Sequence, residues 1–163
     1  TQEEPRKIIE IMKKFRIEDG DKFIEIEPAK EFSVDLVIDF NHPKINQQKF
    51  FYHSDFASFK NDICRARTFG FKHEIEHLNK MGLAMGGSLE NAILVDENGV
   101  VNKEGLRYQN EFARHKLLDF IGDIYLAKHF IIGHFKTFKS GHSLNNKMLR
   151  KLLDEEKDSW RLI

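Results

Sequence analysis

Alternating apolar and polar residues predict several β-strands in the first third of the chain. The clearest pattern covers residues 32–40, where the alternation matches a strand with one buried face. Residues 18–21 read Glu-Asp-Gly-Asp, and an Asp-Gly pair favours a tight hairpin between its flanks, residues 8–17 and 23–27. The first flank also has apolar residues at helical spacing, but the adjoining hairpin favours a strand. Residues 50–53 predict a further strand.

Helical periodicity dominates the rest of the chain. Predicted helices cover residues 56–66 with Ser54 or Asp55 as cap, 72–81 stopped by Gly82, 112–127, and 144–153. Residues 69–71 form a short apolar piece, residues 92–95 and 131–138 predict strands, and the strand over 32–40 ends at Asn41-His42-Pro43. Strands and helices alternate irregularly and no Rossmann glycine pattern is present. The sequence therefore predicts an α+β fold, a two-layer domain of sheet and helices.

Composition narrows the class of protein. The chain has 163 residues, 40% of them hydrophobic and 32% charged, which fits one globular domain. Its formal net charge is zero, so nothing in the charge indicates a nucleic-acid partner. A single cysteine, Cys64, excludes an intrachain disulfide and fits a reducing compartment such as the cytoplasm. We find neither a transmembrane run nor a signal peptide, and because the chain begins with Thr1 we expect a fragment or processed product.

Two polar residues on the strongest predicted helix form a candidate metal-binding pair. His115 and Asp119 are four residues apart, so a helix places them on one face. Imidazole and carboxylate are both zinc ligands, and catalytic zinc usually takes three protein ligands. Asp123, one turn further, could instead orient a histidine such as His142. Two ligands are incomplete, so this spacing also fits an ordinary solvated or capping pair.

A second candidate motif lies on the predicted helix over residues 72–81. Residues 73–77 read His-Glu-Ile-Glu-His, a literal match to the H-E-x-x-H helix of zinc peptidases. The extended motif is absent, because Lys80 stands where a glycine is required and no histidine follows at the required spacing. A more distant glutamate, such as Glu97 or Glu104, could supply the third ligand.

Several segments together resemble one known enzyme family. They are, in chain order, residues 18–22 (EDGDK), 38–43 (IDFNHP), 65–71 (RARTFGF), 86–88 (GGS), 114–119 (RHKLLD) with 122–123 (GD), and 139–142 (KSGH) with 145–146 (NN). Over nearly its whole length the chain resembles the UDP-3-O-acyl-N-acetylglucosamine deacetylases, zinc hydrolases of the first committed step of lipid A biosynthesis in Gram-negative bacteria. The implied reaction is hydrolysis of the N-acetyl group of this UDP-sugar.

The resemblance also implies that part of the enzyme is missing. Family members have two similar α+β halves that sandwich the active site, and this chain resembles the second, C-terminal domain over residues 1–163, with an insert at about 68–95. One zinc histidine and the general-base glutamate lie in the first domain, and no segment here matches them. We therefore expect the chain alone to be inactive. We also expect the face toward the first half to be exposed or covered by self-association.

Individual roles follow from the matched motifs. By resemblance, His115 and Asp119 are zinc ligands, and Thr68 donates its hydroxyl to the developing oxyanion. His142, partnered by Asp123, stabilises that charge or protonates the leaving amine. The residues implied to contact the substrate are Lys22, Lys116 and Lys139 toward the diphosphate, Asp39 and Phe40 at the nucleoside, and Phe69.

The insert has its own implied role. Residues 69–94 resemble a β-α-β unit that forms an apolar passage for the acyl chain, lined by Phe71, Ile75, Ala84 and Leu94. The H-E-x-x-H pattern is then a chance match, with His73 and His77 on the surface.

Three classes of function remain open at this point. The first is the deacetylase half. The second is a zinc peptidase using His73, Glu74 and His77. The third is a non-enzymatic module that binds a sugar nucleotide or an acyl chain without zinc.

Overall fold

The computed structural model describes residues 3–42 and 45–163, so the predicted strand end at Pro43 lies outside it. Its centre is a five-stranded sheet in the order β2-β3-β10-β4-β5, in which β10 runs parallel to β4 and the other neighbours are antiparallel. The strand bounds are β2 Phe15–Asp19, β3 Lys22–Glu27, β4 Ser33–Ile38, β5 Gln48–His53 and β10 His134–Phe138. The predicted hairpin is confirmed, since β2 and β3 pair up to Asp19 and Lys22.

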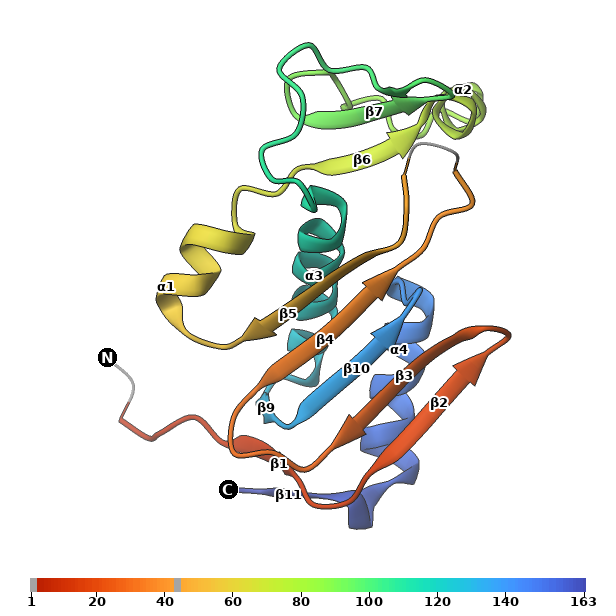
Figure 1. The fold of residues 1–163 in the computed structure, drawn as a ribbon. Helices are drawn as coiled ribbons and strands as arrows, with labels where there is room; N and C mark the ends of the chain where they lie inside the picture. The colour runs from red at the N-terminus through yellow and green to blue at the C-terminus, as the bar shows by residue number, and fades with distance from the viewer. Residues whose placement is uncertain (1–2, 43–44) are drawn as a thin grey trace.

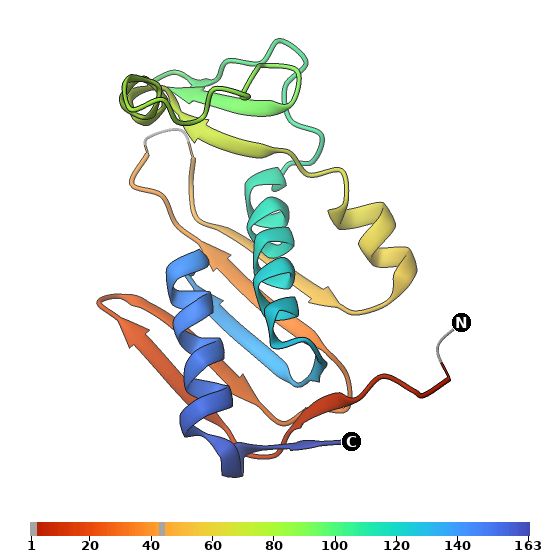
Figure 2. The same ribbon diagram turned by 180° about the vertical axis from the view of Figure 1, so that it is seen from behind.

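Two helices, α3 (Glu111–Ile124) and α4 (His142–Arg150), cover one face of this sheet (Figure 1). Seen from behind, both helices lie in front of the strands (Figure 2). Strand alternation supplies the core between the layers, because Val34 and Leu36 of β4 are buried while Asp35 between them is exposed. Phe135 of β10 meets Phe120 of α3 edge-on at 5.3 Å between ring centroids. The predicted two-layer α+β class is confirmed.

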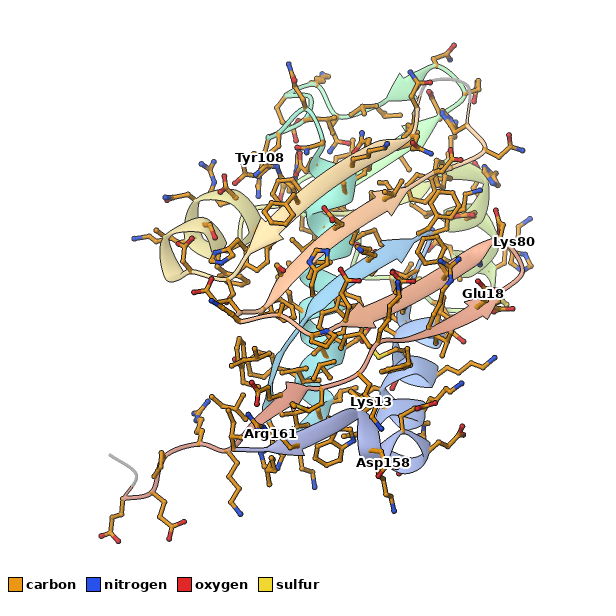
Figure 3. The ribbon with its side chains drawn as sticks, turned by 60° about the horizontal axis from the view of Figure 1, so that its bottom comes forward. Lys13, Glu18, Lys80, Tyr108, Asp158 and Arg161 are labelled. Carbon is orange, nitrogen blue, oxygen red and sulfur yellow. The ribbon has the colours of Figure 1, made fainter. Side chains whose placement is uncertain are left out.

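The opposite face of the sheet carries charged side chains (Figure 3). Lys136 of β10 pairs with Glu27 of β3 at 2.8 Å, and Lys14 pairs with Glu25 at 2.8 Å. None of the helices in residues 3–42 and 45–163 is long and apolar enough to span a bilayer.

A second, three-stranded sheet closes one end of the domain, in the order β11 (Trp160–Leu162), β1 (Ile8–Ile11) and β9 (Phe130–Ile132). The prediction of one strand over residues 131–138 is wrong, because the chain changes sheets at Gly133. A Cβ atom there would lie 2.8 Å from Cγ1 of the buried Ile11, so only glycine lets the two sheets approach this closely. The predicted strand over 8–17 likewise divides into β1 and β2.

The insert is a separate small layer beside one end of α3 (Figures 1 and 2). It contains β6 (Thr68–Phe71), α2 (Lys72–Lys80) and β7 (Ala92–Asp96), and β6 and β7 pair in parallel. A short strand, β8 (Gly99–Val100), pairs with β7. Gly82, which has a φ of +73°, ends α2 as predicted.

The remaining helical segments are shorter or less regular than predicted. Asp55 does cap the first, since its carboxylate accepts the Ser58 backbone N–H at 2.7 Å, but α1 spans only Phe56–Ser58 and continues as a π-helix over Phe59–Ile63. A 3₁₀ turn, Tyr125–Ala127, continues α3. A π-helix, Lys151–Glu155, follows α4, and a 3₁₀ turn, Lys157–Ser159, precedes β11. Helix α4 begins at His142, two residues earlier than predicted.

A buried ion pair joins the insert to α3. Arg67, just before β6, donates from its Nε atom to Oε1 of Glu111 at 3.0 Å, and its backbone N–H donates to the same oxygen at 3.0 Å. Glu111 is fully buried and Arg67 is only 5% exposed. Burial by itself raises the pKa of Glu111, but the hydrogen bonds from Arg67 and the Arg107 backbone outweigh it and hold that pKa below 4.5.

We predict that Gly133→Ala destabilises the domain by about 1–3 kcal/mol, because the added methyl group overlaps Ile11. Urea denaturation measures the free energy of unfolding. The matched control is Gly122→Ala in α3, where an added Cβ meets nothing within 4 Å and where alanine stabilises a helix by up to about 1 kcal/mol. A Gly133→Ala variant as stable as the parent would contradict the close approach of the sheets.

We predict a pH-dependent effect of Glu111→Gln. A carboxyl whose pKa is lowered by folding stabilises the protein above its unfolded pKa, and this contribution is lost as pH falls below about 4.5. The variant should lose roughly 3 kcal/mol at about pH 6, where an uncompensated buried cation remains. The difference from the parent should shrink on acidification, as measured by urea unfolding across pH. Glu90→Gln, at an exposed carboxylate, is the control, and a pH-independent difference would refute the prediction.

Candidate active site

Helix α3 presents a polar stripe on the side opposite its buried face. Leu117, Phe120 and Ile124 are buried on the sheet side. The helical period places His115 and Asp119 on the other side, one turn apart. Nε2 of His115 lies 3.3 Å from Oδ1 of Asp119, so the predicted pair does converge.

The environment of His115 favours its neutral form. Burial lowers the pKa of this imidazole, and the opposing effect of the Asp119 carboxylate is smaller. In the described part of the chain, its Nδ1 atom is buried without a hydrogen-bond partner of acceptable geometry, although the Ala66 backbone is close enough to raise the pKa slightly. A neutral imidazole is the form that binds a metal ion.

His142 reaches the same place from α4. Its Nδ1 atom lies 2.8 Å from Oδ2 of Asp123, and the Asn145 amide donates to that same oxygen at 2.8 Å. Its Nε2 atom faces Asp119, 3.9 Å from Oδ2. Asp123 therefore holds one ring nitrogen and directs the other toward the His115–Asp119 pair, as expected for a positioned acid or base.

A cavity of about 430 Å³ joins these groups to the insert. Its lining residues come from α2, α3, α4 and β6, together with Phe40 after β4: Phe40, Thr68, Phe69, Gly70, Phe71, Glu74, His115, Lys116, Asp119 and His142. Thr68 lies 47 to 74 residues from the helical members of the site, and the fold brings all of them to one hollow. The orientation of the Thr68 hydroxyl toward a substrate stays a prediction.

A larger cavity of about 740 Å³ adjoins the first and lies within the insert. The two share Thr68, Phe69, Gly70 and Glu74. Ile75, Ala84 and Leu94, three residues of the expected passage, line this larger cavity. Phe71, the fourth, lies instead among the lining residues of the first cavity and packs edge-on against Phe40 at 5.6 Å between centroids.

The residues expected to meet a sugar nucleotide are spread more widely. Lys116 lines the 430 Å³ cavity and contacts Oδ2 of Asp119 at 3.0 Å. Lys139 lies 2.8 Å from Asp21 and 3.5 Å from Asp39, and the hydrogen bond with Asp21 raises the pKa of this lysine. Lys22 is exposed at the end of the β2–β3 hairpin, next to Asp21. Neither Lys22 nor Lys139 is a lining residue of the 430 Å³ cavity.

His115 and Asp119 fit two positions of a zinc site. Bonds of about 2.0–2.1 Å in a tetrahedral arrangement place two ligand atoms about 3.3–3.4 Å apart, which matches the observed 3.3 Å. Within residues 3–42 and 45–163, however, no group of three or more His, Cys, Asp or Glu side chains could hold a metal ion. A complete site on this pair would need a ligand from outside that part of the chain.

The rival peptidase motif gains no support from this geometry. His73 and His77 are exposed on α2, as expected for surface residues, and the described ranges supply no third ligand near them. Glu74 is also exposed, but it lines the 740 Å³ cavity together with Ile75 and Leu78.

Some site residues had no role assigned from sequence. Asn145 lay within a recognised motif, but only the structure shows its bond to Asp123. The bonds of Arg67 to Glu111 join residues 44 positions apart, and no local sequence pattern signals such a pair.

Comparison with known proteins identifies the family of the chain. The model of the UDP-3-O-acyl N-acetylglycosamine deacetylase family matches residues 1–154. Proteins named UDP-3-O-acyl-N-acetylglucosamine deacetylase are 51% identical in Shewanella loihica, 50% in Shewanella halifaxensis and 50% in a Psychrobacter species. The alignments cover 97%, 97% and 93% of this chain but 52% of each relative, so the chain spans about half the length of the curated relatives it matches. With a family model matching nearly the whole chain, the protein belongs to the UDP-3-O-acyl N-acetylglycosamine deacetylase family.

Proposed function

We propose that this chain forms the C-terminal half of an enzyme that hydrolyses the N-acetyl group of UDP-3-O-acyl-N-acetylglucosamine during lipid A biosynthesis in the cytoplasm of Gram-negative bacteria. The observation that carries the proposal is the 430 Å³ cavity, which gathers His115, Asp119, His142 and Thr68 and opens onto an apolar cavity. An amide hydrolase needs groups that stabilise an oxyanion and protonate an amine, and this substrate also carries a long acyl chain.

His115 and Asp119 would hold a catalytic zinc ion. When bound, such an ion polarises the amide carbonyl and lowers the pKa of water. The burial that keeps His115 neutral and the 3.3 Å spacing of its Nε2 atom from Asp119 both support this assignment.

The other cavity residues act on the acetamide group. In the hydrolysis a water oxygen bonds to the acetyl carbon, the carbon–nitrogen bond breaks, and the amine nitrogen takes a proton. Thr68 would donate a hydrogen bond to the carbonyl oxygen as negative charge develops there. His142 would deliver the proton from Nε2, because Asp123 occupies its Nδ1 atom at 2.8 Å.

The remaining parts of the substrate would contact both cavities and residues outside them. Lys116, Lys139 and Lys22 supply cations for the diphosphate, while Asp39 and Phe40 lie where the nucleoside would meet the protein. The acyl chain would occupy the 740 Å³ cavity beside Ile75, Ala84 and Leu94.

The metal site is predicted to depend on His115 and not on the H-E-x-x-H helix. Zinc titration of the chain, with bound metal counted after gel filtration, should show weak binding because two protein ligands are available. His115→Ala should abolish that binding, whereas the matched control His77→Ala should retain it. Loss of zinc in the His77 variant alone would favour the peptidase interpretation.

The chain alone is predicted to release no acetate from UDP-3-O-acyl-N-acetylglucosamine with zinc present, because its described residues supply no third ligand and no segment resembles the motif with the general base. A full-length enzyme that contains this segment should release acetate under the same conditions. In that enzyme, Thr68→Ala should lower kcat by about 10²-fold. Acetate assays on both proteins make the comparison. Full activity of the chain alone would refute the division of the site between two halves. Zinc-independent UDP or acyl binding without activity in the full-length enzyme would favour a binding module.

A further inference from the structure

A polar network, buried at Arg67, Glu111 and Asn102 but exposed at Glu104, connects the walls of the 740 Å³ cavity to helix α3. Its centre is the Arg67 guanidinium, whose side chain is 3% exposed. Two of its nitrogens donate to the two oxygens of Glu111, at 3.0 and 3.2 Å. It also donates to Oε1 of Glu104 at 2.7 Å and to the Gly105 carbonyl at 2.7 Å.

Arg67 and Glu111 lie at the junction between the insert and α3. Arg67 immediately precedes Thr68, the first residue of β6. Glu111 is the first residue of α3, one turn before His115 and on the same stripe of the helix. The pair therefore attaches the start of the insert to the start of the helix that carries the proposed metal ligands.

The network continues from Arg67 into the cavity wall. Asn102, only 4% exposed, accepts from the Leu94 backbone N–H at 2.9 Å. Its amide donates to the carbonyls of Leu89 and Ala92, at 2.8 and 2.9 Å, and to Oε1 of Glu104 at 3.5 Å. Leu89, Ala92 and Leu94 all line the 740 Å³ cavity.

Several other contacts between insert and body are aromatic and less directional, and one further hydrogen bond joins Nε2 of His42 to the Asp96 carbonyl at 3.0 Å. Phe69 meets Phe112 and Phe40 edge-on, at 4.9 and 5.3 Å between centroids. Such packing holds surfaces together but tolerates rotation, whereas a planar guanidinium gripping a carboxylate through two nitrogens fixes an angle. Buried ion pairs are also poor sources of net stability compared with apolar residues of similar volume.

We propose that Arg67 is a positioning residue that sets the angle of the β6–α2–β7 unit against α3. Through Glu111, Glu104 and Asn102 it keeps Thr68 and the 740 Å³ cavity aligned with His115 and Asp119. The expected effect of Arg67 on catalysis rests on the proposed function, whereas its effect on the angle of the β6–α2–β7 unit does not.

The angle can be measured with two spin labels. After Cys64→Ser, cysteines replace the exposed residues Lys80, at the end of α2 (Figure 3), and Lys147 on α4. Pulsed electron resonance then gives the distance distribution between insert and body. We expect one narrow distance in the parent and a broader, shifted distribution in Arg67→Lys, which keeps the charge but loses the planar fork. Glu104→Gln, at a 57% exposed side chain, is a milder variant expected to fold and to broaden less.

The control variant Leu152→Ala distinguishes a change in the orientation of the insert from a general loss of stability. Leu152 is fully buried beyond the end of α4, far in sequence from the insert, and its truncation costs stability without touching the network. This variant should unfold at lower urea concentration yet keep the parent distance. An unchanged distribution in Arg67→Lys and Glu104→Gln, or equal broadening in Leu152→Ala, would overturn the proposal.

Kinetics test whether alignment matters to the reaction. In the full-length enzyme, Arg67→Lys should lower kcat at least about tenfold with zinc content unchanged. Broadened distances with unchanged kcat would overturn the catalytic part of the inference. If the unsubstituted full-length enzyme releases no acetate, the proposed function fails and the distance measurement still decides the geometric part.

Discussion

The packing of α3 against the five-stranded sheet is the constraint on which the site depends. Leu117, Phe120 and Ile124 are buried against the strands, so the helix has no freedom to rotate about its axis. This orientation turns His115 and Asp119 away from the sheet. It also brings Asp123 within reach of α4, where Asn145 and His142 contact its carboxylate. The chemistry of the polar stripe is thus positioned by apolar residues on the opposite side of the same helix.

Local patterns in the sequence predicted most of the elements but not how they divide. Alternation identified β4 and the hairpin of β2 and β3, because one face of each strand is buried and the other is not. The break at Gly133 was missed, since strand-forming residues stand on both sides of it and its cause is a tertiary contact with Ile11. The single strand predicted over residues 8–17 is likewise two strands, because β1 and β2 belong to different sheets.

Only the site residues that belong to recognisable sequence motifs could be predicted. Spacing alone placed His115 and Asp119 on one helical face, and the resemblance added Thr68 and His142, which the fold does bring to the same cavity. Phe71 was expected in the passage with Ile75, yet it lines the 430 Å³ cavity and packs against Phe40. The link from Arg67 to Glu111 and Asn102 could not be predicted, because hydrogen bonds between distant segments leave no periodic trace in a sequence.

The incomplete ligand set and the insert attachment lead to one view of how the site is built. Catalytic geometry demands alignment to within a fraction of an ångström, and the groups gathered in the 430 Å³ cavity come from several elements. No third ligand for the His115–Asp119 pair lies among the described residues. Apolar packing holds α3 against the sheet, while a polar network contacts both the insert and α3. Hydrogen-bond networks are directional and apolar contacts are not, which is why the proposed role of Arg67 is to define an angle. Under the proposed function, the half of the site carried by this chain is arranged before any further ligand or base is added, and the remainder of the enzyme would supply groups rather than organise those already present.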